Sequence, residues 1–430
     1  MLRKCNRFPG FLASLAFRLI IAVLTGALLL TLVYCIPGTA MEQNVASSAM
    51  LLTEEGLYPW LYPWCTSMMD NFTDAVMLAT AARNDGSSPL LQAMLANYPV
   101  TNEATTVHAQ LASHYLEGKP YVWQISYGRY WHGYLLYLKP LLCIMDLGEI
   151  RALNGIIQAL LVILVAFLLY KAKKTAYILP WLAAVIMLLP QAQANSLQYS
   201  SCYYAFLLGS LAVLLARNHL EKWEDKIFLY IGIFTAYFDF LTYPIATLGI
   251  PAVMYFAVRV HSNWKADFEK MAKLCFCWAF GYGGMWSGKW ILGSLITGQS
   301  MLADALGKIQ ERTGNDVYGQ PVDAPFQAVW GENSYYFWNN PAAKFVKLFA
   351  LLLCLLWILS VLRKRVSLRQ TVAALPFLII MLMPVVWYAV LTNHSLQHSF
   401  FTNKALVTYL FAWLCLLVKI QEAPNTIKKF

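Results

Sequence analysis

Long runs of apolar residues, separated by short polar segments, dominate the pattern of this 430-residue chain. About 20 consecutive apolar residues are enough to cross the hydrocarbon core of a bilayer. The first run, residues 19–36, is followed by no small-x-small cleavage site, so we expect a retained anchor rather than a signal peptide. The pattern predicts an all-α polytopic membrane protein, a single membrane domain over residues 1–430 with about ten spanning helices.

The expected spans are separated by short turns and by two long connections. Tyr243-Pro244 marks one boundary, because proline cannot continue a helix and restricts the residue before it. The long connections, residues 37–151 and 297–344, are rich in Tyr, Trp, Asn and Asp, and long loops often carry function. The predicted spans are residues 17–36, 153–170, 175–190, 201–216, 227–243, 245–259, 272–296, 345–362, 371–391 and 404–419.

The basic residues indicate which side of the membrane each connection occupies. They cluster at every second connection, which is the positive-inside pattern. We therefore expect a multi-pass protein of the cell membrane, with both termini in the cytoplasm and both long loops outside. The net charge of +10 lies in these clusters and not on a continuous basic face, which argues against nucleic acid as a partner. The clusters are Arg3, Lys4 and Arg7; Lys171, Lys173 and Lys174; Arg217, Lys222 and Lys226; Arg259, Lys265, Lys270 and Lys273; Arg363, Lys364, Arg365 and Arg369; and Lys419, Lys428 and Lys429.

Two surface helices are predicted in the first outer loop. Ser67 to Asp70 has the spacing of a capping box at a helix start. Asp70 and Asp74, four residues apart, share one face of that helix, and its other face is apolar. The segment from Trp131 to Met145 is apolar but too short for a span, so we expect it to lie at the outer surface. The apolar stripe of the first helix is Met69, Phe72, Val76 and Ala79.

The two aspartates of this loop are the first candidates for catalysis. An ionised carboxylate can take the proton from a sugar hydroxyl as that oxygen attacks. Either Asp70 or Asp74 would then be a general base on the outer face. The alternative is structural, because Asp70 as part of a capping box would only stabilise the helix start by about 1 kcal/mol.

Cations beside the membrane are candidates for binding an anionic lipid phosphate. Arg129 lies in the aromatic stretch from Tyr127 to His132, and a guanidinium can hold a phosphate through two parallel bonds. Lys289 and Lys404 lie near the ends of predicted spans. For each of them the alternative is an interfacial role, either in an aromatic belt or as a lysine that reaches the membrane surface.

Three further ionisable residues lie at the outer ends of predicted spans. Asp239 is costly to place near the membrane, which favours a function, although an ion pair is the alternative. His394 and His398 are four residues apart and could share a helix face that binds zinc. No third ligand accompanies them, so we expect no metal or other cofactor. Binding of a phosphate together with Lys404, or a solvated turn, are the remaining interpretations.

Several motifs are absent from the sequence, and their absence narrows the function. There is no phosphate-binding P-loop, no dinucleotide fingerprint and no nucleophile elbow, which argues against ATP-driven transport and a soluble nucleotide-sugar fold. The nine cysteines have no metal-ligand spacing. Cys35 and Cys65 are both expected outside, where they could form a disulfide.

The layout of the chain resembles the GT-C superfamily of membrane glycosyltransferases. The shared features are a first span entering from the cytoplasm and a long first outer loop with acidic residues and surface helices. The stretch from His132 to Tyr170 also resembles these enzymes: an apolar surface helix leads to an acidic turn, an arginine (Arg151) and a span with basic residues at its end. His132-Gly133 stands where those enzymes usually have a pair of prolines.

The resemblance implies a transferase that uses a polyprenyl-phosphate-linked sugar at the outer membrane face. An aspartate would deprotonate the hydroxyl of a glycan or lipid acceptor, and the sugar would transfer with inversion. Arg129, Lys289 and Lys404 would hold the leaving lipid phosphate. The alternatives are a glycan polymerase or ligase with a lipid-linked donor, a lipid or solute transporter or flippase, and a non-catalytic scaffold. Polymerases usually carry their large outer loop late in the chain, and transporters often show internal repeats, neither of which is seen here.

Overall fold

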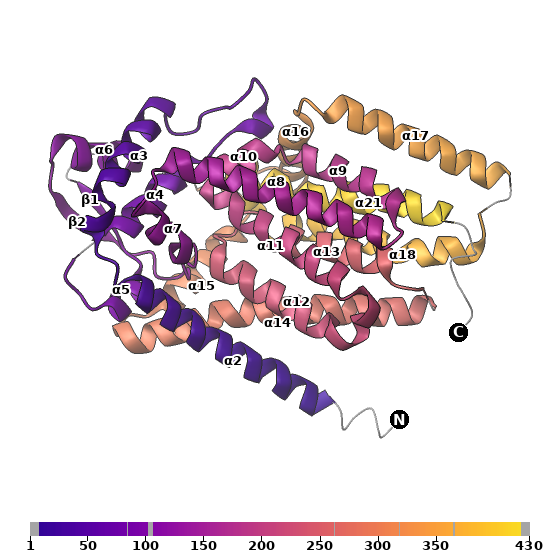
Figure 1. The fold of residues 1–430 in the computed structure, drawn as a ribbon, viewed down its shortest axis with the longest axis horizontal. Helices are drawn as coiled ribbons and strands as arrows, with labels where there is room; N and C mark the ends of the chain where they lie inside the picture. The colour runs from indigo at the N-terminus through magenta and orange to yellow at the C-terminus, as the bar shows by residue number, and fades with distance from the viewer. Residues whose placement is uncertain are drawn as a thin grey trace.

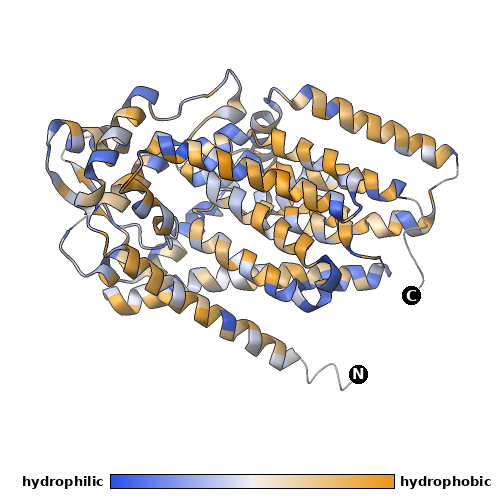
Figure 2. Ribbon diagram, in the orientation of Figure 1, coloured by the Kyte–Doolittle hydropathy of each residue, from blue (hydrophilic) through white to orange (hydrophobic). Residues whose placement is uncertain are grey.

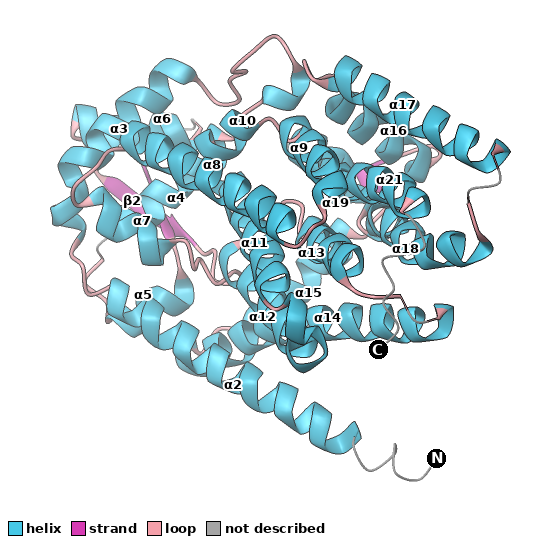
Figure 3. Cartoon of the chain, turned by 45° about the vertical axis from the view of Figure 1, so that its right-hand side comes forward, coloured by secondary structure: helices cyan, strands magenta, loops and turns pink. Residues whose placement is uncertain are grey.

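The structure is a computed structural model that describes residues 8–83, 85–101, 106–261, 263–317, 319–363 and 366–422. It is built almost wholly of helices, and its two small sheets have two strands each (Figures 1 and 3). The expected all-α class is therefore confirmed. Seven of the basic residues used to orient the chain lie outside the described residues: Arg3, Lys4, Arg7, Lys364, Arg365, Lys428 and Lys429.

Each predicted span overlaps a helix of ten or more residues. Among the described residues, six helical segments are long and apolar enough to cross a membrane: Pro9–Val33, Leu147–Lys171, Leu197–Leu215, Ala343–Leu362, Gln370–Val390 and Ser399–Gln421. The other four helices are shorter or less apolar, so a membrane protein is supported while the number of ten spans remains a prediction. In chain order the ten are α2 (Phe8–Val33), α8 (Leu147–Lys171), α9 (Ile178–Met187), α11 (Leu197–Leu215), α12 (Leu220–Phe238), α13 (Ile245–Val258), α14 (Trp264–Thr297), α17 (Ala343–Leu362), α18 (Leu368–Val390) and α21 (Leu406–Gln421).

Apolar side chains on the outside of the helix bundle give a physical reason for a lipid environment. In the most apolar 18-residue stretch of α17 only 11% of the residues are buried inside the protein, and in that of α2 only 22% are. The corresponding share for α11 is 83%. Figure 2 shows two largely hydrophobic ribbons, α17 at the edge of the bundle and α8 across its front. Apolar surface on this scale is unstable in water and is typical of a surface that contacts lipid.

The first long connection, residues 37–151, which is predicted to lie outside the cell, forms a small helical layer at one end of the molecule (Figure 1). Its two strands pair antiparallel, with Tyr98 opposite Ile125. The elements are η1 (Gly38–Met41), α3 (Glu42–Glu55), η2 (Cys65–Ser67), α4 (Asn71–Ala82), α5 (Pro89–Leu95), β1 (Tyr98–Thr101), α6 (Val107–Glu117), β2 (Tyr121–Ile125) and α7 (Leu135–Leu142).

The second long loop and the turn between α18 and α21 (residues 391–405, the predicted last outer turn) contact this end of the molecule. Arg129 of the first loop lies 3.3 Å from the Asp304 carboxylate of the second. The Asn393 amide of the last turn donates a 2.6 Å hydrogen bond to the Asp316 carbonyl. The elements of these segments are α15 (Met301–Arg312), β3 (Asp316–Val317), β4 (Gln320–Pro321), α16 (Pro325–Trp338), α19 (Thr392–Gln397), α20 (Ser399–Thr402) and η5 (Asn403–Ala405).

The opposite end of the bundle carries several of the basic residues, each paired with a carboxylate. Lys174 lies 2.8 Å from Glu422, and Lys270 lies 2.6 Å from Glu224. The start of α2 and the end of α21 lie toward this same end in Figure 1. Three short elements complete the bundle: η3 (Thr175–Tyr177), α10 (Pro190–Asn195) and η4 (Arg217–His219).

Helix α4 differs from the predicted surface helix in its start and its environment. Asp70 is itself the N-cap, because its carboxylate accepts the backbone N–H of Thr73, so the predicted capping box headed by Ser67 is wrong. The Ser67 hydroxyl donates instead to the carbonyls of Tyr62 and Trp64 within η2 and the turn before it. Both aspartates are buried, because neighbouring elements enclose α4 instead of leaving it one polar face.

The segment from Trp131 to Met145 contains only one short helix, α7, of eight residues. At 1.5 Å per residue such a helix is about 12 Å long, which is too short to cross a membrane. Its apolar residues Leu135 and Leu138 are buried, so it packs inside the loop layer as well as against the bundle. Cys35 and Cys65, which could have formed a disulfide, are both free, and the Cys65 thiol lies 3.7 Å from the Tyr335 hydroxyl.

Labelling of engineered cysteines from outside the cell tests the predicted orientation. In a Cys35→Ser background, Glu117→Cys on α6 should react with a membrane-impermeant maleimide in intact cells, because the first loop is expected outside. Glu221→Cys on α12 is the matched control, since its side chain is 84% exposed at the other end of the bundle. It should react only after permeabilisation, and the reverse result would overturn the orientation.

Candidate functional site

The Asp70 carboxylate is held at the N-terminus of α4 by a single residue. One of its oxygens accepts the Thr73 N–H at 3.0 Å, and the other accepts the Thr73 hydroxyl at 2.8 Å. Burial raises the pKa of Asp70 to about 6, while the Thr73 donors and the charge of Lys404 act in the opposite direction. The carboxylate is therefore ionised at neutral pH, and each of its oxygens still has a lone pair to accept another proton donor.

Lys404 is buried in η5, close to Asp70 although far from it in the sequence. Its ammonium donates to the Phe400 carbonyl at 3.2 Å and lies 4.2 Å from the centre of the Tyr199 ring. The Tyr199 hydroxyl donates to the carbonyl of Met68, two residues before Asp70. Tyr199 therefore connects the lysine to the segment that carries the carboxylate, and three distant parts of the chain meet at this point.

Asp74 is contacted from two sides, and these contacts give it a role in holding the fold together. Its carboxylate accepts the backbone N–H of Leu197 at 3.0 Å and lies 3.4 Å from the Arg151 guanidinium. Arg151 also pairs with Glu55 at 2.8 Å. Burial raises the pKa of Asp74 to about 7, and Arg151 opposes that rise. This ion-pair cluster joins α3, α4 and α8, and it fixes α4 in the protein.

Asp239 lies in a turn that repeats the Asp70 arrangement. Its carboxylate accepts both the backbone N–H and the hydroxyl of Thr242, three residues later. The His394 ring donates from Nε2 to the Leu241 carbonyl at 2.7 Å, which places the last outer turn on this loop. The same segment of the chain therefore contacts the Asp239 turn through His394 and approaches Asp70 through Lys404.

The two histidines of the last outer turn are neutral. Burial lowers the pKa of His398 to about 3, and the Arg312 charge lowers it further. The Arg312 guanidinium donates to His398 Nε2 at 2.6 Å. Burial also lowers the pKa of His394 well below its usual value. Neither ring offers a positive charge to a phosphate at neutral pH.

Arg129 and Lys289 are each engaged in contacts of their own. Arg129 pairs with Asp304 and stacks on the Tyr127 ring, with its guanidinium carbon 4.8 Å from the ring centre. The Lys289 ammonium donates to the carbonyls of Ala93 and Met94 at the end of α5, at 2.9 and 3.0 Å. A cation at a helix C-terminus is stabilised by the helix dipole, which gives this lysine a structural role.

His132 is buried in an aromatic cluster between these two cations. Its Nε2 donates to the Tyr127 carbonyl at 2.9 Å, so its Nδ1 accepts the Tyr134 hydroxyl at 3.0 Å. Burial lowers its pKa to about 3. Its backbone lies in the left-handed region at φ +57°, where a non-glycine residue is held by its surroundings. The hydrogen bonds and the backbone together indicate a rigid joint of the first loop.

The predicted site residues thus separate into groups. Asp70 and Lys404 belong to one site, Asp74 belongs to the Arg151 cluster, and Arg129 and Lys289 are engaged elsewhere. Sequence reasoning missed Thr73 and Tyr199, although the spacing Asp-x-x-Thr occurs at both aspartate turns and could have pointed to Thr73. Within the described part of the chain, no three His, Cys, Asp or Glu side chains gather as metal ligands.

No family model matches this chain, and no curated protein and no solved structure matches it either. The resemblance to the GT-C superfamily therefore rests on the layout of the loops and spans described above. The function must be inferred from the geometry around Asp70 and Lys404.

Loss of the arginine in the Asp74 cluster should destabilise the protein. Arg151→Ala leaves Asp74 buried and without its cation, so the free energy of unfolding should fall by about 3–5 kcal/mol. The measurement is thermal unfolding in detergent, followed by intrinsic fluorescence. Lys308→Ala removes an exposed ion pair to Glu311 and is the control, with an expected loss below about 1 kcal/mol. Equal losses in both variants would show that the Arg151 cluster does not hold α4.

Proposed function

We propose that this chain is a GT-C-type membrane glycosyltransferase. It transfers a sugar from a polyprenyl-phosphate-linked donor to a glycan or lipid acceptor at the outer face of the membrane, with inversion. The observation that carries the proposal is the position of a buried lysine, Lys404, near enough to Asp70 to lower the pKa of its carboxylate, where the first outer loop meets the start of the last helix. The ten-span topology with cytoplasmic termini is part of this proposal.

In the proposed reaction Asp70 acts on the acceptor hydroxyl oxygen, and Lys404 acts on the oxygens of the leaving phosphate. The Asp70 carboxylate takes the proton of the acceptor hydroxyl, and that hydroxyl oxygen attacks the anomeric carbon of the donor sugar. The bond between the anomeric carbon and the phosphate oxygen breaks, and the bonding electrons leave with the lipid phosphate. Lys404 stabilises the negative charge that develops on this phosphate. The proton carried by Asp70 is then released to water.

Asp70 suits the role of base better than the other two candidates. Its hydrogen bonds come from Thr73 alone, whereas both oxygens of Asp74 are engaged by groups that hold the fold. Asp239 has an equivalent threonine partner, but it is Asp70 whose carboxylate feels the charge of Lys404. A cation close to Asp70 lets one site activate the acceptor and receive the leaving phosphate.

Replacement of the base should abolish turnover while the protein still folds. Asp70→Asn should lower turnover by about 100-fold or more, because the amide cannot take a proton. Transfer from a panel of polyprenyl-monophosphate sugars, measured in detergent, reports the effect. Purified yield is the folding control, since loss of an N-cap costs only about 1 kcal/mol and asparagine retains much of the cap. Asp239→Asn is the matched variant and should keep near-normal turnover. Normal turnover in Asp70→Asn would remove Asp70 from the mechanism.

The pH dependence of kcat/KM should report the same carboxylate. A general base must be ionised, so activity should fall about tenfold per pH unit below about pH 6, the pKa of Asp70. Thr73→Val removes a hydroxyl that donates to the ionised form, so this variant should move the acidic limb to higher pH. A limb that stays in place in Thr73→Val would mean that another group titrates.

A further inference from the structure

A cavity of about 460 Å³ lies in the first outer loop, at the other end of α4 from Asp70. This volume is within the range of small-molecule sites, about 300–1,000 Å³. Helix α4 has 12 residues and is therefore about 18 Å long, with Asp70 before its first residue and Arg83 after its last. The cavity is thus well separated from the proposed chemistry, and a ligand in it is held without reacting there.

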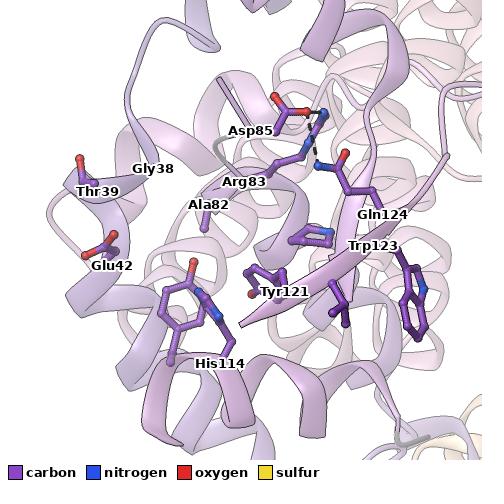
Figure 4. A pocket seen from close by; sticks show the side chains of 13 residues that line it. Gly38, Thr39, Glu42, Ala82, Arg83, Asp85, His114, Tyr121, Trp123 and Gln124 are labelled. Carbon is purple, nitrogen blue, oxygen red and sulfur yellow. Dashed lines mark hydrogen bonds and ion pairs between the residues drawn. The ribbon is translucent and has the colours of Figure 1, made fainter. Parts of the chain in front are cut away.

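The Arg83 side chain gives the cavity an unused hydrogen-bonding capacity. Only 2% of this side chain is exposed, and its Nη2 donates to Asp85. Its Nε and Nη1 are buried and have no hydrogen-bond partner. Buried donors without partners are costly, so a ligand oxygen that accepts from them is favoured. Figure 4 shows Arg83, Asp85 and Gln124 joined on one wall of the cavity.

The other wall is aromatic. The His114 ring stacks on Tyr121 with 3.7 Å between ring centres, and His114 Nδ1 donates to the Lys119 carbonyl at 2.7 Å. Trp123, two residues after Tyr121 on β2, is 53% exposed at the edge of the cavity. An exposed tryptophan offers a flat apolar face at low conformational cost, onto which the C–H face of a sugar ring can stack.

The charge of the cavity selects the class of ligand. The lining contains one arginine, Arg83, which pairs with Asp85, and a second carboxylate, Glu42, so it has no excess of positive charge. An anionic ligand is therefore disfavoured. A neutral polyhydroxylated ligand fits, because its hydroxyls can donate to the carboxylates and its oxygens can accept from Arg83.

We propose that this cavity is a binding site for neutral sugar residues of the acceptor glycan, an assignment of role that rests on the proposed function. Because the cavity lies about one helix length from Asp70, it holds a part of the acceptor that is remote from the reacting hydroxyl. The acceptor is accordingly an extended glycan, and the cavity gives the first outer loop a part in its selection.

Binding of neutral oligosaccharides to the full-length protein in nanodiscs tests this site. The probes are gluco-, manno-, galacto- and N-acetylglucosamine oligomers, with oligogalacturonate as the anionic counterpart, and the readout is isothermal titration calorimetry. At least one neutral oligomer should bind and saturate. Trp123→Ala and Arg83→Met should each weaken that binding by about tenfold or more, through loss of stacking and loss of the buried donors.

The controls separate the site from the proposed catalysis. Trp264→Ala, at the start of α14, removes a tryptophan of similar exposure (55%) outside the cavity and should leave binding unchanged. Asp70→Asn should abolish transfer and keep binding, so failure of one proposal is distinguishable from failure of the other. If Arg83→Met does not fold, the oligosaccharide affinity of Trp123→Ala alone tests the assignment. The assignment would be overturned if no neutral oligomer bound, or if only the anionic oligomer bound. It would also be overturned if Trp123→Ala bound the neutral oligomer as tightly as the unchanged protein does.

Discussion

The burial of charged groups around one short helix, α4, is the constraint on which the rest of the structure depends. Asp74 has no contact with water and is stabilised by Arg151 and by the Leu197 N–H. A buried carboxylate without such partners would cost several kcal/mol. The same contacts fix α4 against α3, α8 and α11, and this placement sets Asp70 at one end of the helix and Arg83 at the other.

The proposed chemistry follows from this placement. Helix α4 carries Asp70 to the point where the last outer turn contributes Lys404, and Tyr199 of α11 contacts both sides of the pair. Preorganised charges of this kind need no rearrangement at the moment of reaction, which is how electrostatic stabilisation contributes most to a rate. The connecting segments that surround the pair also contact one another, and the first of them lies at one end of the bundle (Figure 1).

Local sequence patterns predicted the helices well because hydropathy and helical period are local properties. Each expected span overlaps a helix, and the segment before Asp146 proved too short to be another span. The same reasoning failed at Ser67, because a hydroxyl with capping spacing found nearer backbone partners in its own turn. It also failed for the face of α4, since the apolar Phe72 is exposed whereas the polar Asn71 and Asp74 are buried.

The sequence by itself determined the helical class, the apolar surface for lipid, the two long loops and a short set of ionisable candidates. It did not determine which candidates belong together. Arg129, Lys289 and Lys404 carry the same local signal, a cation near the end of an apolar segment, yet only Lys404 lies beside a first-loop aspartate. The partner of a buried charge depends on packing between segments that are distant along the chain, and only the tertiary structure decides that.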